Sequence, residues 1–210
     1  FKIGYQMDEM VLLHTPNCTK EQAKARSLEM LELVGIAAPE RVYGCYPHEL
    51  SGGMRQRVMI AMALAGEPRL IIADEPTTAL DVTIQAQILE LMMDLQKKLG
   101  MAIIIVTHDL GVIAQMSDEI VVMYGGRICE RGTAEDIFYN PCHEYTKGLL
   151  RSIPSVSNMK KKLVPIAGTP INLLNMPKGC PFAPRCDAAM KICLEKRADR
   201  IFINDDHAAT

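Results

Sequence analysis

The chain has 210 residues, and its 23 lysines and arginines nearly balance its 25 aspartates and glutamates, giving a formal net charge of −2. At roughly 150 residues per domain, this length predicts one domain with an appendage, or one domain that lacks a piece. The balanced charge offers no basic field for nucleic acid, and the longest uncharged run, 163–177, is shorter than the about 20 apolar residues of a membrane-spanning helix.

Residues 1–50 are predicted to be helical. Thr19 and Gln22 have the spacing of a capping box, and apolar residues recur at helical spacing as far as Val34. Gly35 then stands where a glycine commonly ends a helix. This stretch predicts a small helical subdomain.

Helices and short strands alternate between residues 51 and 132, a pattern typical of an α/β fold with a parallel sheet. We expect a helix from Ser51 to Ala65, a fully buried strand over 69–74, a helix from Asp81 to Gly100, and a second buried strand over 102–107.

A hairpin and a change of composition follow. Gly125 and Gly126 separate two further strands, over 119–124 and 127–130, as in a two-residue hairpin turn. From about residue 152, proline, serine and lysine become frequent and the periodicity fades. We therefore expect a separate C-terminal appendage that is reached through a linker.

The first group of candidate functional residues is Ser51-Gly52-Gly53-Met54, at the start of a predicted helix. Two glycines after a hydroxyl residue let backbone amides approach an anion closely, and the helix N-terminus adds partial positive charge. The group therefore favours phosphate binding. The alternative interpretation is a serine N-cap followed by flexible glycines.

The second group follows the two predicted parallel strands. Asp74 ends the first strand, where α/β folds bind ligands, and its carboxylate suits Mg²⁺ held through water. Glu75 can orient a water molecule beside a γ-phosphate or act as a general base. His108 can hydrogen-bond a terminal phosphate. Each residue also has an alternative interpretation when it is considered alone: Asp74 and Glu75 as part of an acidic loop after a strand, and His108 as a structural histidine.

Together, the order and spacing of these groups strongly resemble the ATP-binding-cassette (ABC) ATPases. Leu50–Met54 resembles the signature segment, Leu70–Glu75 the Walker B strand, Thr78–Asp81 the D-loop and His108 the switch histidine. The expected fold is α/β: a P-loop NTPase (RecA-like) ABC cassette fragment with a parallel sheet. Its expected domains are part of the helical subdomain over 1–50, the C-terminal part of the nucleotide-binding core over 51–151, and a small irregular C-terminal extension over 152–210.

Three segments narrow the resemblance to the ATP-binding subunits of oligopeptide/dipeptide importers: 51–64, 140–150 and 179–186. Met54 departs from the glutamine that ends most ABC signatures. The resemblance implies an ATP hydrolase at the cytoplasmic face of the cell membrane, coupling hydrolysis to uptake of peptides or related small solutes. The implied partners are a second ATP-binding subunit in a head-to-tail dimer, two transmembrane permease subunits and, indirectly, an extracytoplasmic solute-binding protein, but no nucleic acid.

The same resemblance implies residue roles toward ATP and Mg²⁺. Asp74 would help to hold Mg²⁺, Glu75 would orient the hydrolytic water, and His108 would contact the γ-phosphate. Ser51, Gly52, Gly53 and Met54 would bind the ATP held by the partner subunit, and Asp81 would signal across the dimer interface.

A phosphate loop is missing from the sequence. No Gly-Lys dipeptide occurs, so the motif G-x-x-x-x-G-K-S/T cannot form. The family places that loop, and the glutamine of the Q-loop, before the residue matched by Phe1. The chain thus resembles the C-terminal part of a cassette, and we expect the chain alone to be unable to hydrolyse ATP.

Three cysteines near the end, Cys180, Cys186 and Cys193, are spaced C-x5-C-x6-C. No signal-peptide pattern opens the chain, so the seven cysteines are interpreted as cytosolic thiols or metal ligands. In some members of the subfamily this extension holds a [4Fe–4S] cluster through four cysteines, the fourth of which would follow Thr210.

A zinc site and plain thiols are the alternatives to an iron–sulfur cluster. His207 is a conceivable substitute ligand, but we expect it to be a solvated tail residue. The other cysteines are scattered and expected to be inert: Cys18, Cys45, Cys129 and Cys142.

Two other functions compete with a transport ATPase. A soluble ABC protein acting on DNA or ribosomes is disfavoured, because the sequence has no long coiled coil and no basic patch. The alternative from a different class is a metal-cluster or regulatory binding module on a catalytically incomplete cassette scaffold.

Overall fold

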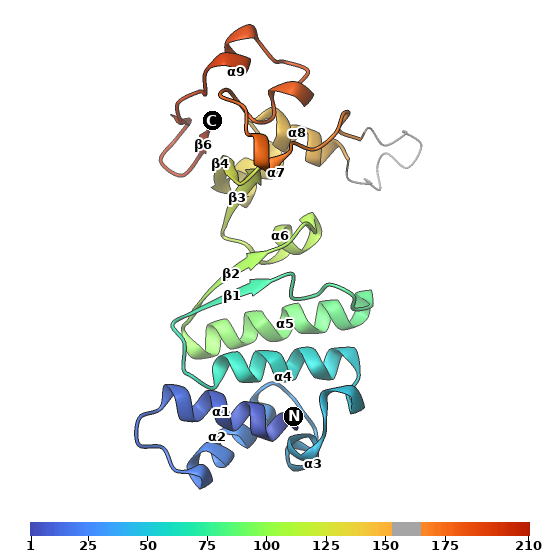
Figure 1. The fold of residues 1–210 in the computed structure, drawn as a ribbon, viewed down its shortest axis with the longest axis vertical. Coiled ribbons are helices and arrows are strands. Elements are labelled where there is room, and N and C mark those ends of the chain that lie inside the picture. The colour runs from blue at the N-terminus through green and yellow to red at the C-terminus, as the bar shows by residue number, and fades with distance from the viewer. Residues whose placement is uncertain (153–164) are drawn as a thin grey trace. The chain divides into compact units, whose positions relative to one another are not determined.

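The computed structural model describes residues 1–152 and 165–210, which form two compact units, residues 1–112 and 113–210 (Figure 1). The linker expected after residue 152 lies mostly outside the described residues. The domain boundaries expected after residues 50 and 151 stay predictions.

Helices around one apolar core open the first unit. They are α1 (Ile3–His14), α2 (Lys20–Leu33), α3 (Pro39–Gly44), the short 3-10 helix η1 (Pro47–Glu49) and α4 (Gly52–Leu64). The predicted capping box is confirmed, since Thr19 Oγ1 accepts from the Gln22 amide and Gln22 Oε1 accepts from the Thr19 amide. Residues on both sides of position 50 share the core, among them Met7, Leu31, Leu64 and Leu95.

A parallel pair of strands completes this unit. β1 (Leu70–Asp74) and β2 (Ala102–Val106) lie in register, with Asp74 opposite Val106. The connecting helix α5 (Val82–Leu99) is capped by the Asp81 carboxylate, which accepts from the Ile84 amide at 3.0 Å. It ends at Gly100 in the left-handed conformation (φ 63°). Figure 1 shows α5 lying along α4 in this unit.

The expectation that both strands are fully buried is wrong. Ile71 and Ile103 pack against the core, but the alternate residues are exposed: Leu70, Ile72, Ile104 and Val106. Successive strand residues point to opposite faces, so one face meets the helices. No described residue of this unit covers the other face. From the sequence alone, an uninterrupted run of apolar residues does not show whether one face of the sheet is covered or both.

The second unit is built on a hairpin. After α6 (Leu110–Met116), β3 (Glu119–Tyr124) turns at Gly125 and Gly126, both with positive φ, into β4 (Arg127–Thr133), which confirms the predicted turn. α7 (Ala134–Tyr139) and α8 (Glu144–Arg151) follow. Ile120, Val122 and Ile137 form a small core between hairpin and helices.

Residues 165–210 carry short elements: the 3-10 helices η3 (Leu173–Asn175) and η4 (Ala183–Arg185), then α9 (Lys191–Glu195), β5 (Ile201–Phe202) and β6 (Ala208–Ala209). These elements contact the hairpin of the same unit. β6 pairs with β4, giving a four-stranded sheet in the order β3-β4-β6-β5. Phe182 packs with Tyr124 and Cys129 of the hairpin. The extension is therefore part of the hairpin's own core.

None of the helices among residues 1–152 and 165–210 combines the length and apolar character that crossing a membrane requires.

Candidate functional site

The parallel pairing of β1 and β2 brings Glu75 and His108 together. The two strands end at the same edge, where the Glu75 amide donates to the Val106 carbonyl at 2.8 Å. His108 Nδ1 and Glu75 Oε1 lie 3.0 Å apart. Because the His108 side chain is 80% exposed, its other ring nitrogen is free to meet a ligand.

The backbone at Glu75 is strained and held by a turn. Glu75 has φ 46° and Ala79 has φ 63°, both in the left-handed region, where a residue with a side chain costs about 1 kcal/mol or more. The Thr78 amide donates to the Glu75 carbonyl at 3.2 Å, and the Thr78 hydroxyl donates to Glu75 Oε2 at 2.7 Å. The turn thus fixes the direction of the carboxylate.

These bonds also set the charge of Glu75. The Thr78 hydroxyl and then the His108 ring hold the pKa of this carboxyl below its usual range. A carboxylate of lowered pKa is a weaker base. The arrangement therefore suits orienting a water molecule better than removing its proton outright.

Asp109, which the sequence reasoning missed, fixes the segment next to His108. Its Oδ1 accepts from the Gly111 amide at 2.8 Å at the start of α6, and Gln85 of α5 donates to its Oδ2 at 3.0 Å. The Gln85 bond is the main reason that the pKa of Asp109 is lowered. An aspartate directly before an apolar stretch is an N-cap signal that could have revealed it.

Asp74, at the end of β1, is exposed, and within the described residues its side chain makes no hydrogen bond or ion pair. An unpaired carboxylate oxygen is the donor type that hydrated Mg²⁺ takes. Asp74 therefore fits the ion expected beside Glu75.

The glycines after Ser51 have a packing role. The Ser51 hydroxyl accepts from the Met54 amide at 3.3 Å and caps α4. A Cβ on Gly53 would lie 2.7 Å from Ile84 Cγ2, so the glycine permits close approach of α4 to α5. Within the described residues, no hydrogen bond or ion pair joins this group to Glu75 or His108. Its expected role toward a partner's ATP stays a prediction.

The C-terminal cysteines lie near one another. The Cys180 amide donates to the Cys193 carbonyl at 2.8 Å, and Cys129, Cys180 and Cys186 belong to one apolar cluster. The sequence suggested that Cys129 is isolated from the other cysteines, but in the structure it lies in the same cluster as Cys180 and Cys186. Burial, with a contribution from Cys180, raises its pKa to about 11, which keeps its thiol protonated and agrees with an inert residue.

Neither this geometry nor the relatives described below support a [4Fe–4S] cluster on Cys180, Cys186 and Cys193. Among the described residues, Glu130, Cys142 and His207 form a different group of potential metal ligands, whose ligand atoms all lie within 4.8 Å of one another.

Glu130 and His207 form a buried pair. Both are almost fully buried, so the expectation of a solvated tail histidine is wrong. His207 Nε2 lies 2.8 Å from Glu130 Oε1, and the amides of Cys142 and His143 donate to the same carboxylate. Burial alone would raise the pKa of Glu130, but the donors around it hold that pKa below its usual value.

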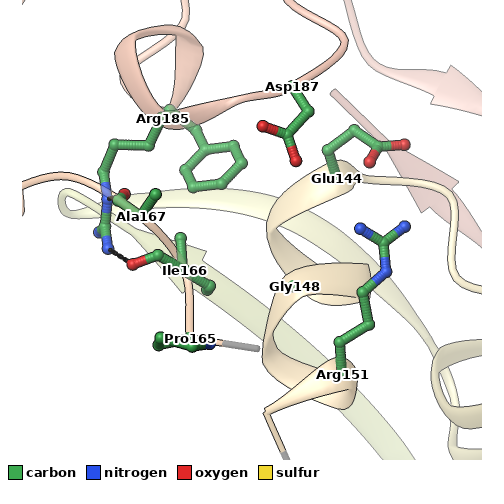
Figure 2. A pocket seen from close by; sticks show the side chains of 9 residues that line it. Glu144, Gly148, Arg151, Pro165, Ile166, Ala167, Arg185 and Asp187 are labelled. Atoms are coloured by element: carbon green, nitrogen blue, oxygen red, sulfur yellow. Dashed lines mark hydrogen bonds between the residues drawn. The ribbon is translucent and has the colours of Figure 1, made fainter. Parts of the chain in front are cut away.

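A small hollow of about 130 Å³ also lies in the second unit (Figure 2). Glu144 and Arg151 of α8 line it, together with Asp187 and Arg185. Arg185 donates to the carbonyls of Ala167 and Ile166 and to the Tyr124 hydroxyl. Its guanidinium is thus used to hold the chain at 165–167 against the hairpin.

Two family models match the chain. One, described as "ABC transporter", matches residues 2–78, and the other, "Oligopeptide/dipeptide transporter, C-terminal region", matches residues 129–193. With the paired Glu75 and His108 at the end of a parallel sheet, these matches make the chain similar to ABC transporter proteins in both of its parts.

Curated proteins similar to the chain include peptide transport proteins. The oligopeptide transport ATP-binding protein OppD of Bacillus subtilis is 56% identical over 207 residues, which are 98% of this chain and 58% of OppD. The dipeptide transport ATP-binding protein DppD of the same organism is 51% identical over 205 residues, 98% of this chain and 61% of DppD. The chain therefore spans about three fifths of the length of these relatives.

Solved cassettes show the same fold. The ATP-binding cassette MJ0796, in a dimeric post-hydrolysis state bound to ADP and Pi, matches with a TM-score of 0.56 and 30% identity over 64% of this chain and 57% of its own. The protein cbiO1 of Clostridium perfringens, part of an ABC transporter complex, matches with a TM-score of 0.57 and 30% identity over 66% of this chain and 53% of its own.

Proposed function

We propose that the chain is part of the ATP-binding subunit of an ABC importer, which couples ATP hydrolysis to the uptake of oligopeptides or dipeptides. The observation that carries this proposal is the Glu75–His108 contact at the shared end of β1 and β2. The names of the relatives support the peptide substrate.

Each residue of the site has a role in this proposal. Asp74 would hold Mg²⁺, which neutralises negative charge on the phosphates when bound. Glu75 orients the attacking water through an oxygen fixed by Thr78. His108 uses Nδ1 toward Glu75, so Nε2 faces a phosphate and donates to it when the ring is protonated. These groups stabilise charge that develops in the transition state.

A second cassette would supply the rest of the site. Ser51, Gly52, Gly53 and Met54 would approach the nucleotide of that partner, and Asp81 would link the two sites. The dimeric state of MJ0796 supports a cassette partner. The proposed importer is completed by two transmembrane permease subunits, which the ATP-binding subunits would contact at the cytoplasmic face of the membrane, and by an extracytoplasmic solute-binding protein.

The test is ATP hydrolysis by the complete product of the gene. Glu75→Gln should lower kcat by about 100-fold or more while ATP still binds, because the water loses its orienting carboxylate. Glu90→Gln, an exposed change on α5, is the matched control and should leave kcat unchanged. Full turnover by Glu75→Gln would overturn the proposal. The 210-residue chain alone, which lacks Gly-Lys, should show no turnover.

The [4Fe–4S] cluster stays a prediction that no observation supports. Anaerobic purification followed by iron and sulfide assays tests this prediction. Colourless protein that contains no iron would show that the chain holds no iron–sulfur cluster. No observation favours a metal-cluster or regulatory module as the function of the chain.

A further inference from the structure

We propose that Glu130, Cys142 and His207 form a binding site for one divalent transition-metal ion of the zinc class. One carboxylate oxygen, one sulfur and one imidazole nitrogen of these residues lie within 4.8 Å of one another. Bonds of 2.0 to 2.3 Å to a tetrahedral ion require ligand separations of about 3.3 to 3.7 Å. Cys142 is exposed and lies between α7 and α8, so its sulfur can close the remaining distance.

The two buried ligands are already oriented. His207 Nε2 faces Glu130 Oε1 at 2.8 Å, and an ion would take the place of the proton between them after a shift of about half an ångström. The other ring nitrogen, Nδ1, lies 3.7 Å from Asp136 Oδ1. A carboxylate behind the second nitrogen is the arrangement that orients histidines bound to metals.

Thr146 of α8 also lies beside this carboxylate. Its buried hydroxyl is close enough to Glu130 to act on that carboxyl as a hydrogen-bond donor. The amides of Cys142 and His143 donate to the same carboxylate. Hydrogen bonds of this kind orient a carboxylate that binds a metal.

The donor set selects the class of ion. A thiolate and an imidazole favour Zn²⁺ and its neighbours over Mg²⁺ or Ca²⁺, which take oxygen ligands. The three ligands come from β4, from the segment between α7 and α8, and from the segment before β6. A bound ion would therefore fasten residues 201–210 to the hairpin of the same unit.

The experiment uses the full chain after removal of metals with EDTA. Equilibrium dialysis with Zn²⁺ should show one bound equivalent, and titration with Co²⁺ should produce the near-ultraviolet absorption of a cobalt–thiolate bond. Cys142→Ser should remove that absorption and weaken Zn²⁺ binding at least about tenfold. Because the Cys142 side chain is exposed, the variant should fold, as circular dichroism can confirm.

Cys193→Ser is the matched control, since it removes a cysteine of the C-terminal group and leaves Glu130, Cys142 and His207 intact. It should keep the bound equivalent and the cobalt–thiolate absorption. In the unmodified chain, Zn²⁺ should also slow alkylation of Cys142, measured by mass spectrometry. Three results would each overturn the proposal: no Zn²⁺ binding, binding unchanged in Cys142→Ser, or loss of the ion in Cys193→Ser alone.

Discussion

At the scale of single residues, the turn after β1 stores strain next to the proposed catalytic carboxylate. Glu75 and Ala79 both have positive φ, and the hydrogen bonds from Thr78 hold the turn in place. Glu75 needs its side chain for the proposed chemistry, so its strain serves the site. Ala79 has no such chemistry, and its strain can be removed without touching the carboxylate.

Ala79→Gly should therefore raise the free energy of unfolding by about 0.5–1 kcal/mol, because glycine adopts a positive φ without a clash. Urea denaturation measures the change. The matched control is Ala63→Gly on the exposed side of α4, which should lower stability by about 1 kcal/mol. Equal effects of the two substitutions would show that the turn holds no strain.

His143 should make stability depend on pH. Burial lowers the pKa of this histidine below its ordinary 6.5, outweighing the charges of Glu130 and Glu144. The unfolded chain then binds a proton before the folded chain does. Stability from this group is complete above about pH 6.5 and is lost as the pH falls through the folded pKa.

His143→Asn is the variant that tests this. His143 Nδ1 accepts from the Tyr145 amide at 3.1 Å, and asparagine keeps an acceptor at this N-cap without titrating. With EDTA present, urea denaturation at several pH values between 7.5 and 5 should show a flatter decline for the variant. An identical decline in both proteins would contradict the role of His143.

At the scale of elements, the contact between α4 and α5 depends on one glycine. Gly53→Ala should lower the free energy of unfolding by about 1–3 kcal/mol, because its Cβ would meet Ile84 Cγ2 at 2.7 Å. Gly52→Ala is the control, since its Cβ would meet only the flexible end of Leu80 at 3.3 Å. Similar stability of both variants in urea denaturation would refute the packing role.

Elements with local signals could be predicted from the sequence. Thr19 with Gln22, Asp81, Gly100 and the Gly125-Gly126 turn each carry their own physical cause within a few residues. Local signals also allowed the ends of β1 and β2 to be predicted. The positions of Glu75 and His108, which follow these strands, could be predicted with them. Their contact follows from parallel pairing, which the alternation of helices and strands indicates.

What depends on distant contacts could not be predicted. The exposed face of β1 and β2 depends on what covers the sheet, which the strands themselves do not encode. The burial of His207 depends on Glu130, which lies 77 residues earlier. Tails are usually solvated, so nothing near His207 in the sequence indicated that it would be enclosed.

At the scale of the whole molecule, the two compact units have separate apolar cores. A chain of this kind need not unfold in one step. The pair of Glu130 and His207 lies wholly within the second unit. A substitution that removes this contact should therefore destabilise the second unit and leave the stability of the first unit unchanged.

His207→Ala should unfold the second unit selectively. It removes one of the hydrogen bonds to the buried Glu130 carboxylate, and losing a hydrogen bond to a charged group costs about 1.5–3 kcal/mol. In hydrogen exchange followed by mass spectrometry with EDTA present, β3 and β4 should lose protection while α2 and α5 keep it. Asp205→Ala, an exposed tail change, should alter neither. Loss of protection in α2 and α5 as well would show that the units unfold together, and unchanged protection in β3 and β4 would show that the pair does not hold the extension in place.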